Sequence, residues 1–207
     1  KKITKCDLTG VTDWGRTPTL PELAFSNCTA LQEVTLPDDM KVIGTGAFFG
    51  CAALTTVNLS QVTWINLNAF WGCTSLETLA LDNVTAIGQE AFYGCTGLET
   101  LKIPKCTQFG NYIVSGCKAL TRIEATAAGD FVDISDGRSS IERTAVFHNR
   151  DSHYGDSAFN PAKCDLVLNA DKKQDGNATP KVFSDNEWLV MPNGQLMRWN
   201  SITFAQQ

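Results

Sequence analysis

The sequence shows no excess of basic residues. It carries 17 Lys and Arg against 22 Asp and Glu, for a formal net charge of −5, and neither half of the chain is basic. A surface that follows the phosphates of nucleic acid is therefore not expected. No run of about 18 apolar residues occurs, so no segment is expected to span a membrane as a helix. These absences leave a chain of 207 residues that is long enough to bury a sizeable core.

Patterns for catalysis and metal binding are also scarce. The chain contains no G-x-S-x-G and no C-x-x-C, and its two histidines are His148 and His153. A Ser-His-Asp enzyme would have to recruit one of these two side chains. An enzyme is therefore far less favoured than the two non-catalytic roles considered below, a binding module and a passive spacer. The spacing of the histidines with Asp151 and Asp156 matches no metal motif, so a solvated loop is favoured. We expect no catalytic residue, no metal and no cofactor.

Eight cysteines remain to be explained, and five of them are periodic. Intervals of 23, 22, 22 and 22 residues separate them, and such a period indicates a repeat protein. An A-F-x-[GN]-C motif precedes an L-x-x-[LV]-x-[LI] core in four copies, and a weaker fifth copy follows. The periodic cysteines are Cys28, Cys51, Cys73, Cys95 and Cys117.

Each period predicts one coil of chain. The segment from Val57 to Leu59 alternates apolar and polar residues, which is typical of a short strand with one buried face. We expect a turn at Val62 and Ile65, and then a short helix or helical turn from Ala69 to Cys73. A position between these two features is expected to need a positive φ, because it holds residues that accept one cheaply. These residues are Gly44, Asn66, Gly88 and Gly110.

The five periodic cysteines are expected to form a buried thiol ladder. Adjacent coils would bring their Cα atoms close, but parallel Cβ directions disfavour disulfides, so we expect small apolar groups with weak S–H donors. Cys6 and Cys106 are candidates for a second inward position, because I-T-K-C near the start of the chain echoes I-P-K-C at 103–106. Cys164 is expected in the last coil.

The repeat motif resembles the BspA-like leucine-rich repeats of Bacteroides-type and other host-associated bacteria. The resemblance covers about residues 20–125 and implies an α/β, β-rich, right-handed solenoid of 22–23-residue repeats. Around it we expect an N-terminal cap at 1–19, and an irregular β-rich C-terminal cap with a degenerate last repeat at 126–207. Within the C-terminal cap, strands are expected near 131–134 and 141–147. An apolar stretch at 188–191 follows, and a turn is expected at 192–194 before the segment 196–204. Family members are typically exported, many are lipid-anchored, and the best known are implicated in adhesion.

Two surfaces could carry function. The outward positions of the predicted strands, here called the strand face, suit a broad protein or glycan contact, although a threonine-rich ladder also simply favours β-structure. Three aromatic residues in the variable slot of the repeat, here called the aromatic row, could bind sugar rings or a protein, or could half-bury against each other. The strand face comprises Glu33, Thr56, Thr78, Thr100 and Arg122 in one column and Thr35, Asn58, Ala80, Lys102 and Glu124 in the other. The aromatic row comprises Phe49, Trp71 and Tyr93, with Trp64 as a possible extension.

The sequence therefore favours a non-catalytic binding module outside the cell, contacting a protein or glycan of a host or neighbouring cell. The alternative is a passive spacer within a larger surface protein. The chain begins at Lys1 without methionine, so we expect a processed or trimmed product, and a lipid anchor on an absent N-terminal segment fits the resemblance. The ligand, the binding face and the oligomeric state are left open by the sequence.

Overall fold

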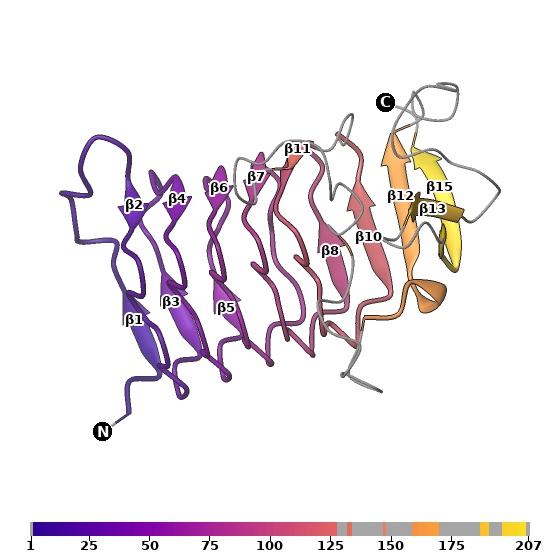
Figure 1. The fold of residues 1–207 in the computed structure, drawn as a ribbon. Coiled ribbons are helices and arrows are strands. Elements are labelled where there is room, and N and C mark those ends of the chain that lie inside the picture. Colours follow the sequence, from indigo (N-terminus) through magenta and orange to yellow (C-terminus); the bar gives the residue numbers. More distant parts are fainter. Residues whose placement is uncertain are drawn as a thin grey trace.

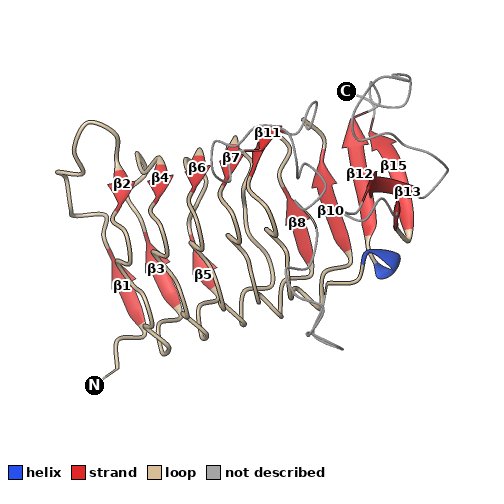
Figure 2. Ribbon diagram, in the orientation of Figure 1, coloured by secondary structure: helices blue, strands red, loops and turns tan. Residues whose placement is uncertain are grey.

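The computed structural model describes residues 2–127, 132–133, 147, 159–169, 187–190 and 196–205. In these residues, short strands lie side by side in a row that runs from β1 (Lys5–Asp7) to β15 (Ser201–Ala205) (Figure 1). Figure 2 shows how little helix accompanies them. The helix that the described part contains is a single 3-10 turn at Pro161–Lys163. The β-rich expectation is confirmed, and the α component is nearly absent.

Two parallel sheets follow one another along one side of the row. Their strand orders are β1-β3-β5 and β15-β12-β10-β8. Successive strands of the periodic region are one repeat apart, so that Glu33 lies opposite Thr56 and Thr100 opposite Arg122. β12 and β15 continue the second sheet in parallel beyond the periodic region. The bounds of the remaining strands are β3 (Glu33–Thr35), β5 (Thr56–Val57), β8 (Thr100–Lys102), β10 (Arg122–Ala125) and β12 (Asp165–Asn169).

The repeat between β5 and β8 interrupts this side. Residues 77–80 form no strand, although Leu76, Leu79 and Leu81 carry the same motif as the other repeats. Leu76 and Leu81 are buried, so the repeat still contributes to the core. The main-chain N–H of Glu99 donates to the carbonyl of Glu77, which keeps the two repeats in contact.

A third parallel sheet lies where the sequence analysis expects a turn. Trp64 and Ile65 form β6, which pairs with β4 and β7 in a six-stranded sheet of order β11-β9-β7-β6-β4-β2. The expected turn at Val62 and Ile65 is therefore wrong at its second residue. Two-residue strands carry too little alternation to be recognised from sequence. Their bounds are β2 (Thr19–Leu20), β4 (Val42–Ile43), β6 (Trp64–Ile65), β7 (Ala86–Ile87), β9 (Gln108–Phe109) and β11 (Val132–Asp133).

The segment from Ala69 to Cys73 forms tight turns and no helix. Alternate N–H groups bond differently: Phe70 N–H donates to Ala91 in the next repeat, whereas Trp71 N–H donates to Asn68 in its own turn. A helix would direct all of these N–H groups along its own axis. The expected helical turn is therefore replaced by a ladder of turns that ties each repeat to the next.

The shared glycine position is needed for space and not for a positive φ. The positive φ values occur two residues later, at Gly46 and Asn68 for example, and again at the glycine before the cysteine. At Gly88, an added Cβ would lie 2.5 Å from the main-chain nitrogen of Leu67, and at Gly110 it would lie 2.1 Å from that of Gln89. The expectation of a positive φ at these positions is therefore wrong. Asn66 holds the equivalent place in one repeat, so the close approach is not uniform along the row.

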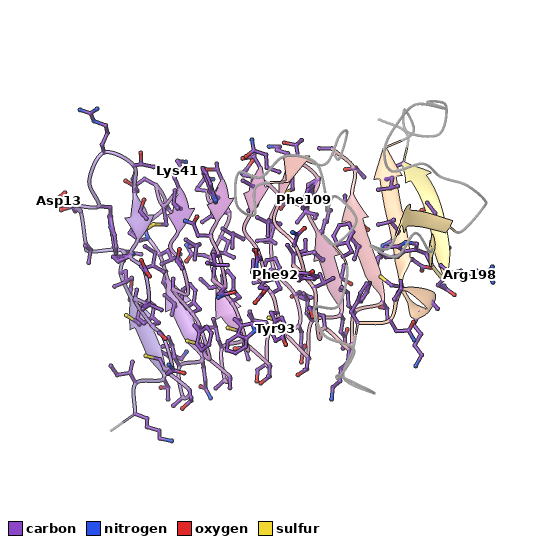
Figure 3. The ribbon with its side chains drawn as sticks, viewed as in Figure 1. Asp13, Lys41, Phe92, Tyr93, Phe109 and Arg198 are labelled. Atoms are coloured by element: carbon purple, nitrogen blue, oxygen red, sulfur yellow. The ribbon has the colours of Figure 1, made fainter. Side chains whose placement is uncertain are left out.

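The core is a continuous column of aromatic rings enclosed by leucine and isoleucine. The rings of Phe25, Phe48, Phe70 and Phe92 stack with centroids 5.4, 5.1 and 5.7 Å apart. Figure 3 shows side chains filling the space between the sheets, with Phe92 in the interior. Parallel stacking of equivalent rings follows directly from the repeat, because each coil places the same side chain at the same height.

The last described elements close the row with larger side chains. Phe147, buried completely, contacts both Phe109 and Trp199, with ring centroids 6.0 and 6.1 Å apart, and Trp199 also packs on Phe159. β13 (Glu187–Val190) pairs antiparallel with β14 (Leu196–Arg198). Trp199 and Asn200 separate β14 from β15 within the segment 196–204. The expected strand at 141–147, except Phe147, and the segment from His148 to Asp156 lie outside the described residues.

Candidate binding surfaces

The strand face presents two columns of side chains in two runs of parallel register, β1 to β5 and β8 to β15, with the interrupted repeat between them. The pairing extends the predicted columns to β1 at one end and to β12 and β15 at the other, so the face is longer than the periodic region. Parallel pairing with one side chain per repeat keeps equivalent residues adjacent. The first column contains Lys5, Glu33, Thr56, Thr100, Arg122, Asp165 and Ser201, and the second contains Asp7, Thr35, Lys102, Glu124, Val167 and Thr203.

Charge on the strand face is concentrated on β1 and β3 and again on β8 and β10, on either side of the interrupted repeat. Lys5 Nζ lies 2.5 Å from a Glu33 carboxylate oxygen, and Arg122 Nε lies 2.7 Å from Glu124 Oε1. Between these pairs, Thr56 and Thr78 are exposed and uncharged. Exposed ion pairs add little stability, so their main effect is on the potential that a partner meets. The face therefore has a neutral centre between two charged regions.

Three of the predicted strand-face residues differ from the expectation. Asn58 is committed to structure: its Oδ1 accepts from Leu36 N–H at 2.6 Å and its Nδ2 donates to Leu36 carbonyl at 2.9 Å. The side-chain amide thus takes over main-chain pairing beyond Val57, where β5 ends. Thr78 and Ala80 are exposed but lie in the interrupted repeat, outside any strand. Lys102 is exposed on β8 as expected.

The C-terminal end of the face contains an acidic site that the sequence analysis misses. Asp165 Oδ1 accepts from Ser201 Oγ at 2.6 Å and from Asn200 Nδ2 at 2.8 Å. These hydrogen bonds stabilise the carboxylate and lower the pKa of Asp165. The three residues are 35 and 36 positions apart in sequence, so no local motif announces them. They fasten β15 to β12.

The aromatic row forms, but it is partly buried. The ring of Trp71 lies 4.2 Å from that of Phe49 and 5.3 Å from that of Tyr93, centroid to centroid, in tilted contacts. Tyr93 is only 8% exposed, and the indole Nε1 of Trp71 is buried without a hydrogen-bond partner. Rings that cover each other offer less surface to a sugar. The arrangement corresponds to the packing alternative more closely than to an open platform.

Trp64 lies on a different side of the repeat. It belongs to β6 in the six-stranded sheet, next to Val42 and Ala86, and is 44% exposed. In the described part of the chain, no ring contact joins Trp64 to the aromatic row. Its exposed neighbour in sequence is Leu67, 41% exposed, which the sequence analysis does not single out. Only the position of Leu67 on the outer side of the turn distinguishes it from core leucines.

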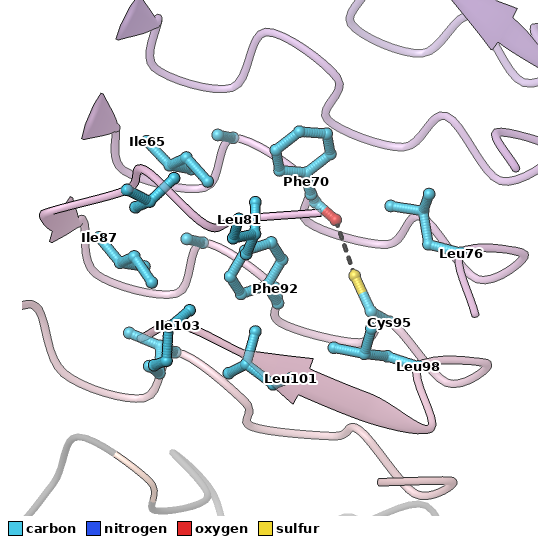
Figure 4. Packing of buried hydrophobic residues seen from close by; sticks show 14 of the residues in the cluster. Ile65, Phe70, Leu76, Leu81, Ile87, Phe92, Cys95, Leu98, Leu101 and Ile103 are labelled. Carbon is cyan, nitrogen blue, oxygen red and sulfur yellow. Dashed lines mark hydrogen bonds between the residues drawn. The ribbon is translucent and has the colours of Figure 1, made fainter. Parts of the chain in front are cut away.

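The thiol ladder has a specific hydrogen-bonding role. The Sγ of Cys51, Cys73, Cys95 and Cys117 each donates to the carbonyl of the core Phe one repeat earlier, at 3.0–3.1 Å. Figure 4 shows this bond between Cys95 and Phe70. The Phe70 carbonyl also accepts from the N–H of Cys73, so both of its lone pairs are used. Cysteine recurs because it is small, apolar and still able to donate once.

Burial keeps the ladder thiols protonated. Desolvation raises the pKa of Cys51 and of Cys117 to about 12, and it raises the pKa of Cys73 and of Cys95 well above the usual thiol range. Cys28, at the end of the ladder, is half-buried. All eight cysteines are free thiols.

The other three cysteines occupy separate positions. Cys106 and Cys164 are buried, whereas Cys6 is half-buried. Cys6 lies opposite Val34 in the β1–β3 pairing. That register places Cys6 in a strand column, five positions from the place of Cys106 in its own repeat, so the echo between the two I-x-K-C sequences does not reflect a shared structural position.

We expect thiol labelling of the native protein to divide the cysteines into two groups. Cys6 and Cys28 should react with iodoacetamide first, while Cys73 and Cys95 should react only on unfolding, because a buried protonated thiol is a poor nucleophile. Peptide mass spectrometry over a time course measures this. Rapid modification of Cys73 or Cys95 in the folded state would contradict the ladder.

The same thiols make stability dependent on pH in a defined direction. Their pKa is higher in the folded state than in the unfolded chain, so stability is full at neutral pH and should fall as the pH rises above about 8.5, where unfolded thiols ionise. Urea unfolding at pH 8 and pH 10, for the wild type and a Cys73→Ala, Cys95→Ala variant, tests this. The variant should show the shallower decline.

Other kinds of site are not found in the described part of the chain. Among these residues, no group of three or more His, Cys, Asp or Glu side chains is placed to hold a metal ion. No helix there is long and apolar enough to cross a membrane. The histidines and Asp151 and Asp156 lie outside the described residues, so the solvated-loop interpretation of that segment stays a prediction.

Comparison with known proteins gives a family match and structural neighbours. The model of the BspA type leucine-rich repeat region matches residues 4–124 in six copies. The match begins within the segment that the sequence analysis assigns to the N-terminal cap. No curated protein matches the chain.

Two solved structures resemble the chain. One is the leucine-rich repeat protein of T. pallidum, at 22% sequence identity and a TM-score of 0.55, with 65% of this chain and 70% of that chain covered. The other is a leucine-rich cell surface protein of Faecalibacterium prausnitzii A2-165, at 26% identity and a TM-score of 0.50. That match covers 65% of this chain and 41% of the Faecalibacterium chain, which is therefore much longer than the matched part. The first similarity concerns the fold alone.

Proposed function

We propose that this chain, which belongs to the BspA-type leucine-rich repeat family, is a non-catalytic binding module that acts outside the cell. The strand face is the binding surface, and its partner is a protein or glycan on a host or neighbouring cell. The observation that carries the proposal is the parallel register of outward side chains in two runs, β1 to β5 and β8 to β15. An extended regular surface suits a broad contact better than a small-molecule pocket.

The distribution of charge on this face favours a protein partner over a glycan. A neutral threonine centre between ion-paired regions resembles the arrangement in which a protein interface has an uncharged middle and a polar rim. The aromatic row is the second candidate, and a glycan would be its natural ligand. The burial of Tyr93 makes it the weaker of the two.

The location outside the cell is supported by the similarity to a protein described as a cell surface protein. The free, buried thiols are compatible with that location, because a thiol inaccessible to oxidants persists. A lipid anchor, and the right-handed solenoid form of the whole repeat region, are parts of the same proposal. Parallel pairing of each repeat with the next in the six-stranded sheet supports the solenoid form.

Binding to arrays of extracellular-matrix proteins and glycans tests the proposal. We expect a protein hit whose affinity falls at least about tenfold in a Thr56→Arg, Thr100→Arg variant, because two large cations would enter the neutral centre. Gln108→Arg is the matched control, since it adds the same side chain to an exposed position on the six-stranded sheet. Circular dichroism should show equal folding of all variants.

The other outcomes separate the alternatives. A hit that survives the threonine changes but is lost in Trp71→Ala, with an unchanged melting temperature, would move the site to the aromatic row. Absence of any hit for the wild type would favour a passive spacer within a larger surface protein.

A further inference from the structure

The sulfur atoms of the thiol ladder follow one another along the row at a nearly constant interval. From Cys51 to Cys117, each Sγ lies 3.0–3.1 Å from the carbonyl of the equivalent phenylalanine, so the same geometry recurs in each repeat. The phenylalanine rings of successive repeats stack with centroids 5.1–5.7 Å apart. Neighbouring parallel strands are about 4.8 Å apart. Adjacent sulfurs of the ladder are therefore separated by about 5 Å.

Each donating thiol points along the row, towards the cysteine of the preceding repeat. Cys95 donates to the carbonyl of Phe70 (Figure 4), and that carbonyl also accepts from the main-chain N–H of Cys73. The acceptor therefore belongs to the turn that holds Cys73, one repeat before Cys95. Burial is the largest cause of the raised pKa of Cys73, and the charges of Cys95 and Cys51 come next, as expected for a sulfur with a close neighbour on each side.

This arrangement disfavours a disulfide and suits an ion placed between two sulfurs. A disulfide needs sulfurs about 2 Å apart. A metal–thiolate bond is about 2.3 Å long, as in zinc sites. An ion midway between two sulfurs about 5 Å apart meets both of them close to that length. Because each thiol already points towards the neighbouring sulfur, the two bonds to such an ion would lie nearly on one line.

We propose that adjacent thiols of the ladder form a two-coordinate site for a soft divalent metal ion that accepts linear ligation by two sulfurs, such as Hg²⁺. Thiolates select soft metal ions. Two thiolates neutralise a divalent ion, whereas a monovalent ion would leave a net negative charge in the core, which is costly. Zn²⁺ takes four ligands in structural sites, and the described residues contain no group of even three that could hold a metal. Zn²⁺ is therefore disfavoured at a pair of sulfurs.

Binding exchanges two protons for the ion. Each thiol releases its proton to solvent, each sulfur donates an electron pair to the ion, and no group is oxidised or reduced. The thiol hydrogen bonds are lost, but each phenylalanine carbonyl keeps its bond from a cysteine N–H, so no buried carbonyl loses its last partner. Because the sulfurs are buried, the ion enters only when a repeat opens locally, and uptake is slow. The site lies in the core and is independent of the proposed binding function.

The ladder has a defined capacity for such ions. Each sulfur joins one ion, so the five thiols from Cys28 to Cys117 form at most two bridged pairs. Each bridged pair connects two neighbouring repeats and binds the folded chain, so the loaded protein should unfold at a higher denaturant concentration. The other cysteines lie outside the ladder and add no pair to this number.

Two variants that lose the same number of thiols test whether adjacency matters. Cys51→Ala, Cys95→Ala leaves three ladder thiols of which none are adjacent, whereas Cys28→Ala, Cys51→Ala leaves three that are. The folded chains are incubated with HgCl₂ and washed with excess glutathione, which removes ions held by a single sulfur. Mass spectrometry for mercury then counts the retained ions. We expect two per chain for the wild type, one for the variant with adjacent thiols and none for the variant with separated thiols.

Urea unfolding with and without the ion gives a second measurement. Hg²⁺ should raise the unfolding midpoint of the wild type and of the variant with adjacent thiols, and leave that of the variant with separated thiols unchanged. Equal retention of mercury by the two variants, both folded by circular dichroism, would overturn the proposal. A wild type that retains no ion, either in the folded state or after refolding with HgCl₂ present, would overturn it without any substitution. Retention of Zn²⁺ in the same assay would contradict two-coordinate ligation.

Discussion

Replacing Phe70 with alanine should lower the free energy of unfolding by about 3–5 kcal/mol. Phe70 is completely buried and its ring is stacked between those of Phe48 and Phe92. The change removes the transfer energy of the ring and leaves a cavity that two neighbouring repeats border. Each repeat contacts only its neighbours. Losing the Phe70 ring therefore weakens the contact between the two halves of the row. Chemical denaturation followed by circular dichroism measures the effect.

Two comparisons make this result interpretable. Phe70→Leu fills much of the space and should cost less than half as much as alanine. Phe25→Ala removes an equivalent ring at the end of the stack, where Phe25 is half-exposed, and should also be milder. Equal losses at Phe25 and Phe70 would contradict a core whose cohesion depends on stacking from both sides.

Gly110→Ala should be the most damaging of the glycine substitutions. An added Cβ would lie 2.1 Å from Gln89 N and 2.5 Å from Gln89 Cα, both main-chain atoms that no side-chain rotation can move. The neighbouring repeats would have to separate, with strain of about 1–3 kcal/mol or more and weakened main-chain pairing. The bond from Gly110 N–H to the Ile87 carbonyl, 2.7 Å long, is the first to be affected. Thermal unfolding measures the loss.

Gly10→Ala is the control for this substitution. Nothing lies within 4 Å of a Cβ at Gly10, and its φ is not in the left-handed region. Restriction of the unfolded chain should make this change neutral or slightly stabilising. If Gly110→Ala were equally tolerated, the close approach of successive repeats would not be a requirement of the fold.

The repeat register could be predicted from the sequence because every signal recurs at one period. Cys51, Cys73 and Cys95 fix the frame, and the leucines that follow fix which residues face inward. The six-stranded sheet could not be predicted, because strands as short as Trp64–Ile65 gain their stability from neighbours one repeat away. The pattern of apolar and polar residues within one repeat does not indicate which strands pair between repeats.

Positive φ values escaped prediction for a related reason. Leu23, Glu90 and Tyr112 all have φ between 55° and 59°, although these residue types disfavour that region. The turn ladder imposes their backbone, because hydrogen bonds to the next repeat, such as Leu23 N–H to Thr45 and Glu90 N–H to Asn111, hold the chain in place. A glycine in the sequence indicates either a positive φ or a close approach of another main-chain segment, and the sequence alone does not say which of the two applies.

The sequence predicts which residues of the candidate surfaces align along the repeats, but it does not predict how exposed their side chains are. The positions of Phe49, Trp71 and Tyr93 follow from the period, and the structure brings their rings together. Their burial depends on the size of the adjacent rings and on the segments that lie over them. The amide of Asn58 shows the same limit, since its bonds to Leu36 depend on the end of a strand in another repeat.

The thiol–carbonyl bonds also constrain how such a chain can change in length. In the ladder from Cys51 to Cys117, each cysteine finds its acceptor in the repeat before it, so that each core Phe from Phe25 to Phe92 offers its carbonyl to the next repeat. Removing one whole period would rejoin a donor with an equivalent acceptor, whereas removing part of a period would leave a sulfur and a carbonyl mismatched in the interior. Duplication and loss of entire units are therefore the changes that the interior tolerates, and they alter the reach of the outer surface without altering its chemistry.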